Sequence, residues 1–130
     1  MAEKERVSYW LDIVNEDLDT AEFLFSGGRW LYTAFMCHQA IEKLLKAYWC
    51  ATREDEPLYT HSHTRLLEEC NLMGELSEEQ LRFIAMMVPM NIEARYPSYK
   101  NHISNTLNEE ACRYILEQTK DIRQWILSKL

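Results

Sequence analysis

Apolar residues recur every three or four positions along four long stretches of this chain, at about residues 5–25, 29–51, 77–96 and 109–129. This spacing places the apolar side chains on one face of an α-helix. No stretch of useful length alternates apolar and polar residues as a strand would. The sequence therefore predicts an all-α fold, an antiparallel up-and-down four-helix bundle with one additional short helix.

Local signals mark where these helices begin and end. Gly27 and Gly28 end the first helix, and so short a connection makes the first two helices antiparallel neighbours. Ser77 followed by Gln80 predicts reciprocal capping at the start of the third long helix. Asn108, followed by two glutamates, is the expected N-cap of the last helix.

Two regions of the middle of the chain carry further expectations. The polar stretch 52–64 is predicted to be a loop that leads to a short helix at about residues 65–70. The third long helix should end at Tyr96, because Pro97 disfavours helical geometry in the residue before it. Its core-facing stripe is expected to be Leu81, Ile84, Ala85 and Val88.

Length and charge limit the possible functions. The chain of 130 residues has room for one domain, 1–130, with one core. Lysine and arginine total 14 against 21 acidic residues, which gives a net charge of -7. This charge argues against a broad surface for duplex nucleic acid, so a phosphate ligand would have to be held locally.

The cysteines and the apolar runs indicate the compartment. The four cysteines are widely spaced and form no CxxC pair, so reduced, buried thiols and a cytoplasmic location are expected. No apolar run approaches the roughly 20 residues that cross a bilayer. Secretion and membrane insertion are therefore disfavoured.

The stretch 94–108, here called the basic segment, contains no acidic residue in an otherwise acidic chain. Arginine can hold a phosphate through two parallel hydrogen bonds, tyrosine can stack on a base, and histidine can move a proton near neutral pH. A nucleotide or single-stranded RNA site needs these residue types. A solvated loop between two helices is the alternative interpretation. The residues concerned are Arg95, Tyr96, Tyr99, Lys100 and His102.

Other polar residues favour structural interpretations. His61 and His63 could offer two imidazoles to a metal, but a zinc site needs three or four ligands and no others are suitably spaced. No metal and no cofactor are therefore expected. His38 lies on the apolar stripe of the second helix and is interpreted as a core histidine. Glu42 and Lys46 are four residues apart and are interpreted as a surface ion pair.

Several short segments of the chain form a recognisable pattern: Trp10-Leu11, DLDTAE at residues 17–22, HQAIEKLLKA at 38–47, Thr60-His61 before Leu66-Leu67, and ARYP at 94–97. Through these segments the chain resembles the HEPN family of small helical bundles over nearly its whole length. The resemblance implies either nucleotide binding or metal-independent RNA cleavage. It also implies a homodimer, because two sites meet across a dimer cleft in the ribonuclease members.

The resemblance leaves three hypotheses. The first is a nucleotide- or RNA-binding protein that acts with a separate minimal nucleotidyltransferase and uses Arg95, Tyr96, Tyr99 and Lys100. The second is a metal-independent endoribonuclease of toxin–antitoxin type. Active members of the family carry an arginine, then four to six residues, then a histidine, and Arg95 and His102 fit this pattern with six residues between them. There the histidine would act on the ribose 2′-hydroxyl and the arginine on the phosphate. The third is a protein-association module whose faces around Trp30, Trp49 and Trp125 are buried between subunits.

Overall fold

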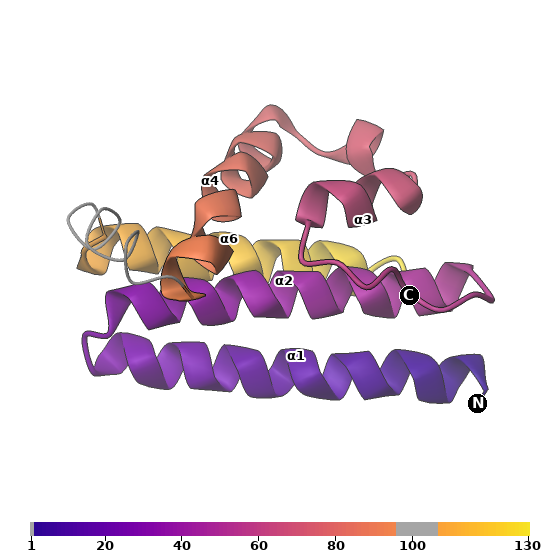
Figure 1. Ribbon diagram of the computed structural model, residues 1–130, viewed down its shortest axis with the longest axis horizontal. Helices are drawn as coiled ribbons and strands as arrows, with labels where there is room; N and C mark the ends of the chain where they lie inside the picture. Colours follow the sequence, from indigo (N-terminus) through magenta and orange to yellow (C-terminus); the bar gives the residue numbers. More distant parts are fainter. Residues whose placement is uncertain (1, 96–106) are drawn as a thin grey trace.

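The computed structural model describes residues 2–95 and 107–130, with the backbone alone for 92–95 (Figure 1). Its long helices are α1 (Glu3–Ser26), α2 (Trp30–Thr52), α4 (Glu78–Arg95) and α6 (Glu109–Leu127). Helix α3 (His63–Glu69) is short and is followed by a 3₁₀ turn, Met73–Glu75. The described residues contain no strand, so the all-α class with four long helices and one short helix is confirmed.

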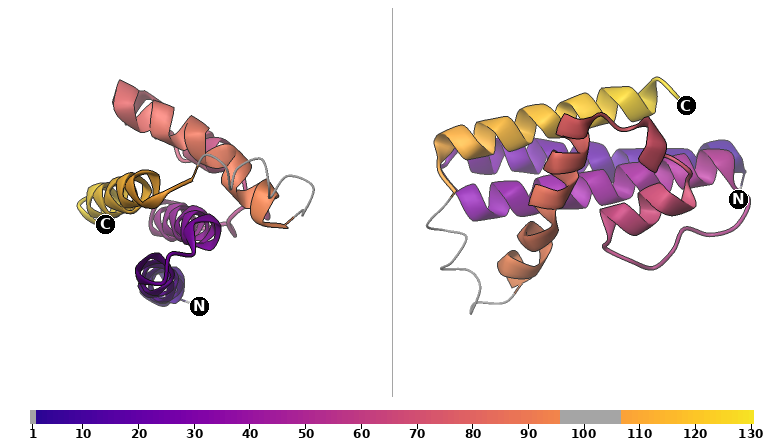
Figure 2. Two further views of the ribbon diagram at one scale, coloured as in Figure 1. Left: turned by 90° about the vertical axis from the view of Figure 1, so that its left-hand side faces the viewer. Right: turned by 90° about the horizontal axis from the view of Figure 1, so that it is seen from above.

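Helix α2 is the central element of the bundle and contacts α1, α3, α4 and α6. Helices α1 and α2 are antiparallel, and α6 runs in the same direction as α2 (Figure 1). Helix α4 crosses α2 at a steep angle rather than lying along it, as the turned views in Figure 2 also show. Because α2 is covered on several sides, most of its residues are buried, including polar ones.

The predicted helix ends are confirmed within a few residues. Gly28 adopts a positive φ of 72°, which glycine tolerates without strain, in the turn between α1 and α2. The Ser77 backbone N–H donates to Gln80 Oε1 at 2.8 Å and the Gln80 N–H donates to Ser77 Oγ at 3.1 Å, which is the reciprocal cap predicted. Asn108 Oδ1 accepts from the Ala111 N–H at 2.8 Å.

Two local predictions need correction. Helix α3 begins at His63 rather than at residue 65, because Ser62 caps it by accepting the Arg65 N–H. On α4, Ile84 is buried as predicted, but Leu81, Ala85 and Val88 are exposed. A second stripe with the same helical spacing faces the core instead, and its larger side chains bury more apolar area. This stripe consists of Phe83, Met87 and Met90 together with Ile84.

All four cysteines are buried and free, as the sequence predicted. Burial raises the pKa of the Cys37 thiol to about 12, which keeps it protonated and unreactive. Among the described residues, no helix combines the length and apolar character needed to cross a membrane.

Candidate functional site

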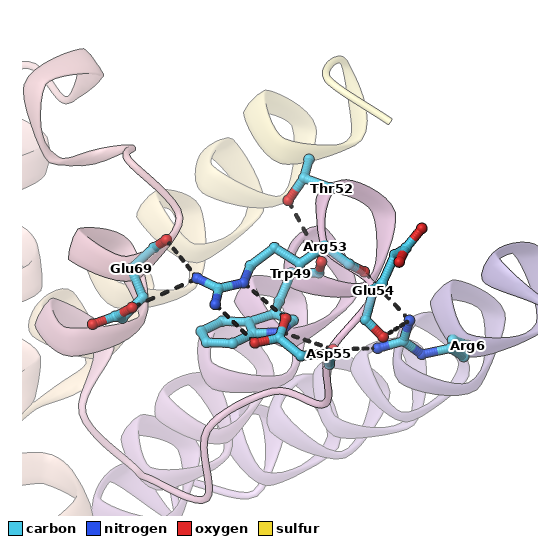
Figure 3. Close-up of polar contacts among 7 residues, drawn as sticks. All are labelled: Arg6, Trp49, Thr52, Arg53, Glu54, Asp55 and Glu69. Carbon is cyan, nitrogen blue, oxygen red and sulfur yellow. Dashed lines mark hydrogen bonds and ion pairs between the residues drawn. The ribbon is translucent and has the colours of Figure 1, made fainter.

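The loop between α2 and α3, residues 53–62, is anchored at its start by Arg6 of α1 (Figure 3). The Arg6 guanidinium donates to the carbonyl oxygens of Arg53 at 3.3 Å, Glu54 at 3.2 Å and Asp55 at 2.6 Å. Carbonyls at and beyond the last turn of a helix lack partners within that helix. Arg6 supplies donors for them and so ties the start of the loop to α1.

Trp49 forms a second anchor for the same loop. Its indole N–H lies 3.0 Å from the Asp55 carbonyl oxygen and 3.1 Å from Asp55 Oδ1. Arg53 lies over the indole ring at 3.9 Å, pairs with the Asp55 carboxylate, and donates to the Glu69 carbonyl of α3 (Figure 3). Trp49 is 1% exposed within its own chain, so the interpretation that it lies on a face between subunits is wrong.

The far end of the loop is held by a buried carboxylate. His61 Nδ1 lies 2.8 Å from Glu42 Oε1. Lys43 and Lys46 place their ammonium groups 3.0 and 3.1 Å from Glu42 Oε2. The Glu42 side chain is 2% exposed, so the ion pair with Lys46 exists but is not the surface pair that the sequence suggested. Its burial follows from the central position of α2.

These contacts determine the charge of Glu42 and the orientation of His61. Burial by itself would raise the pKa of Glu42, but the hydrogen bond with His61 and the charges of Lys43 and Lys46 outweigh it and lower the pKa. Glu42 is therefore ionised and can only accept, so His61 Nδ1 carries a proton and donates it. The other ring nitrogen, Nε2, is not used by this contact. The side chain of His61 is 47% exposed.

His63 and His38 form a buried stacked pair, which confirms the core interpretation of His38. The ring centroids are 3.9 Å apart and His63 is 3% exposed. His63 Nε2 lies 2.9 Å from the His38 carbonyl oxygen, so Nε2 carries the proton. Burial lowers the pKa of His63 to about 4, although this hydrogen bond acts in the opposite direction. His63 is therefore neutral at physiological pH.

We expect His63 to make the fold less stable in mild acid. Its pKa is lowered from 6.5 to about 4 in the folded chain, so the unfolded chain binds the proton more readily between these values. The contribution of neutral His63 to the free energy of unfolding is complete at pH values above the pKa of the unfolded chain. About 2 kcal/mol of this free energy should be lost between about pH 7 and pH 5. Urea unfolding of the wild type and of His63→Gln at several pH values measures this loss.

Glutamine is the matched replacement, because its Nε2 can still donate to the His38 carbonyl but does not titrate. The difference in unfolding free energy between wild type and His63→Gln should therefore change by about 2 kcal/mol over this range. A difference that stays constant with pH would show that His63 is not held neutral by the fold.

A cavity of about 290 Å³ lies where the loop, α2 and α4 meet. This volume lies just below the range of small-molecule pockets, about 300–1,000 Å³. The Gln39 amide of α2 donates to Asn91 Oδ1 of α4 at 3.2 Å and joins the two helices beside it. The cavity is lined by His38, Thr60, His61, Ser62, His63, Val88 and Asn91.

The structure describes only part of the predicted site. Arg95 is the last residue of α4, four positions or about one helical turn beyond Asn91 of the cavity wall. Tyr96, Tyr99, Lys100 and His102 lie outside the described residues. Within the residues described, no group of three His, Cys, Asp or Glu side chains could hold a metal ion.

Sequence reasoning missed the contact between Glu42 and His61. The two residues are 19 positions apart, on a helix and in a loop, and no periodicity relates them. Both fall inside segments on which the family resemblance rests, HQAIEKLLKA and Thr60-His61. That shared membership was the one signal in the sequence that could have paired them.

Comparison with known proteins identifies the family. The HEPN domain model matches residues 7–130. Among solved structures, TT1696 from Thermus thermophilus superposes with a TM-score of 0.80 at 19% identity, covering 96% of this chain and 98% of that chain. ST0689, an archaeal HEPN homologue, gives 0.71 at 19% identity, covering 95% and 97%. No curated protein matches the sequence. At this identity the two structures show a shared fold, and the match of the family model over residues 7–130 shows that the chain belongs to the HEPN domain family.

Proposed function

We propose that this HEPN protein binds a nucleotide or single-stranded RNA through phosphate groups, at a site formed by the cavity and the adjoining basic segment. The observation that carries the proposal is the position of the cavity, one helical turn from Arg95 along α4. In this proposal the protein is a cytoplasmic homodimer that acts with a separate minimal nucleotidyltransferase.

The cavity wall offers hydrogen-bond donors suited to phosphate oxygens. Thr60 Oγ1 accepts the Ser62 backbone N–H at 3.1 Å, and Ser62 Oγ accepts the Arg65 N–H at 3.1 Å. Each hydroxyl oxygen is therefore used as an acceptor, and its own proton can be directed to a ligand. These neutral donors suit an acidic protein, in which the ligand must be held locally.

The basic segment would supply the charge and the stacking surface. Arg95 and Lys100 are proposed to contact phosphate, the arginine through two parallel hydrogen bonds. Tyr96 and Tyr99 are proposed to stack on bases, a contact worth about 1–3 kcal/mol per base in single-strand binding proteins. Together with the cavity, these residues would recognise a phosphate and the nucleoside attached to it.

Calorimetric titration of the purified protein with uridine nucleotides and with a short single-stranded RNA tests the proposal. Arg95→Ala and Lys100→Ala are each expected to weaken binding about tenfold, since a charge-assisted hydrogen bond contributes about 1.5–3 kcal/mol. Arg82→Ala is the matched control, because this arginine is on the same helix, is 73% exposed and lies near its other end.

Two results would contradict the proposal. One is the absence of binding to folded wild-type protein at low salt. The other is an equal loss of affinity in Arg82→Ala, which would indicate a non-specific charge effect. RNA cleavage in excess chelator, lost in both Arg95→Ala and His102→Ala, would instead support the metal-independent endoribonuclease.

A further inference from the structure

We propose that His61, held in place by Glu42, is a phosphate contact of the cavity that works only in its protonated form. This inference rests on the proposed function and adds a residue and a pH dependence to it. The ligand group is a phosphate, either the terminal phosphate of a nucleotide or an internal phosphodiester of RNA.

The first argument is the orientation of the imidazole. His61 Nδ1 donates to Glu42 Oε1, and the two lysines occupy Glu42 Oε2, so both carboxylate oxygens are engaged. The ring is therefore held by a buried, ionised anchor while the side chain remains 47% exposed and lines the cavity. Because Nδ1 is engaged with Glu42, Nε2 is the ring nitrogen that can form a hydrogen bond with a ligand.

The second argument is the charge around the His61–Glu42 pair. Helix α2 contributes Glu42, Lys43 and Lys46, and α1 contributes Asp17, whose carboxyl interacts with Glu42 and Lys43. When all four are charged, two negative and two positive charges cancel. The protonation state of His61 then decides whether this group is neutral or positive.

The remaining groups on the cavity wall do not alter that balance. Neutral His63 of α3 and His38 of α2 are both buried. The described residues of α4 that line the cavity are Val88 and Asn91, and neither carries a charge. Among the described residues of the wall, His61 is thus the ionisable side chain that is also exposed to a ligand.

The chemistry of phosphate gives the direction of the effect. Neutral His61 would present an Nε2 lone pair to a phosphate oxygen, and the two acceptors repel each other. Protonated His61 presents an N–H on a cation, which forms a short charge-assisted hydrogen bond. Affinity should therefore rise as the pH falls through the range in which histidine titrates, about pH 5 to 8.

The test uses a ligand whose own charge stays constant. An oligomer of about six uridines with hydroxyl groups at both ends has only phosphodiesters and no base that titrates in this range, and it matches the length of a single-strand site. We expect the full chain to bind it about tenfold more tightly at about pH 5.5 than at about pH 7.5. Uridine monophosphate forms the second arm. Its own phosphate takes up a proton near about pH 6, so the wild type is compared with His61→Asn at each pH. A ratio of the two affinities that rises in acid for this ligand alone would assign a terminal phosphate.

Two substitutions at His61 separate its roles. His61→Asn retains an amide N–H in the place of Nδ1 for Glu42 but removes Nε2, and His61→Gln retains a donor near Nε2 that cannot titrate. Both variants should lose the pH dependence, and His61→Asn should bind about tenfold more weakly than wild type at about pH 5.5 but equally at about pH 7.5. Thermal unfolding of each variant verifies that it is folded.

Arg82→Ala is the control, because this exposed arginine near the other end of α4 should leave the affinity and its pH dependence unchanged. His102→Asn tests whether the other histidine assigned to ligand chemistry carries the pH dependence instead. Persistence of the pH dependence in folded His61→Asn and His61→Gln would overturn the inference, as would its loss in His102→Asn alone. Binding that requires Arg95 but does not vary with pH would refute the role of His61 and leave the proposed function standing. Absence of binding at every pH would refute both.

Discussion

Replacement of Glu42 by alanine is expected to lower the free energy of unfolding by about 4 kcal/mol, because removal of one partner from a buried charge cluster leaves the others uncompensated. Lys46 is 8% exposed and Lys43 18% exposed, so neither ammonium group is well hydrated where it lies. The end of the loop would also lose its anchor at His61. Urea unfolding at neutral pH measures the change.

Glu117→Ala is the control for this experiment, because Glu117 is an exposed glutamate in the middle of α6 and its replacement should change stability by less than about 0.5 kcal/mol. A loss in Glu42→Ala as small as this would mean that the cluster contributes nothing to folding.

The pH dependence of Glu42→Gln provides an independent check. The pKa of Glu42 is lowered in the folded chain. The ionised carboxylate therefore contributes its full share to the free energy of unfolding at pH values above the ordinary pKa of glutamate. This contribution is lost as the pH falls through the lower folded-state pKa. The stability difference between wild type and Glu42→Gln should therefore shrink in acid.

Trp49→Ala is expected to cost about 4 kcal/mol, within the range for truncating a large buried aromatic side chain. The substitution removes a 1% exposed indole from the core. It also removes the N–H that holds Asp55 and the ring on which Arg53 lies. Thermal or urea unfolding measures the cost.

Trp49→Phe separates packing from hydrogen bonding, since it keeps most of the buried ring and loses the N–H, and a loss of about 1–2 kcal/mol is expected. Tyr59→Ala in the same loop is the surface control, because Tyr59 is 101% exposed. If Trp49→Ala were no more destabilising than Tyr59→Ala, the assignment of Trp49 to the core would be refuted.

These two residues act on one loop from opposite ends. Trp49 and Arg6 hold its start at Asp55, and Glu42 holds its end at His61. The cavity wall is built from the end of this loop, so its shape depends on both anchors. A partial loss of ligand binding in folded Trp49→Phe would therefore be consistent with the proposed site.

Features that depend on neighbouring residues could be predicted from the amino-acid sequence. Helix periodicity, the Gly27–Gly28 turn, the cap formed by Ser77 and Gln80, and the Asn108 cap all act within a few positions of the chain. The backbone hydrogen bonds and steric contacts that form these features involve only residues close together in the sequence. These elements could therefore be predicted within a few residues.

Which surfaces and charges are buried depends on how the helices pack against one another. Two stripes of α4 have helical spacing, and packing against the other helices selected the one containing Phe83 and Met87. The i,i+4 spacing of Glu42 and Lys46 fits an exposed ion pair as well as a buried one. The pair is buried because the neighbouring helices cover α2. The burial of Glu42 and its contact with His61 depend on residues that are distant in the sequence. The energy of a buried charge depends on the structure that surrounds it, and a local sequence pattern carries no information about those surroundings.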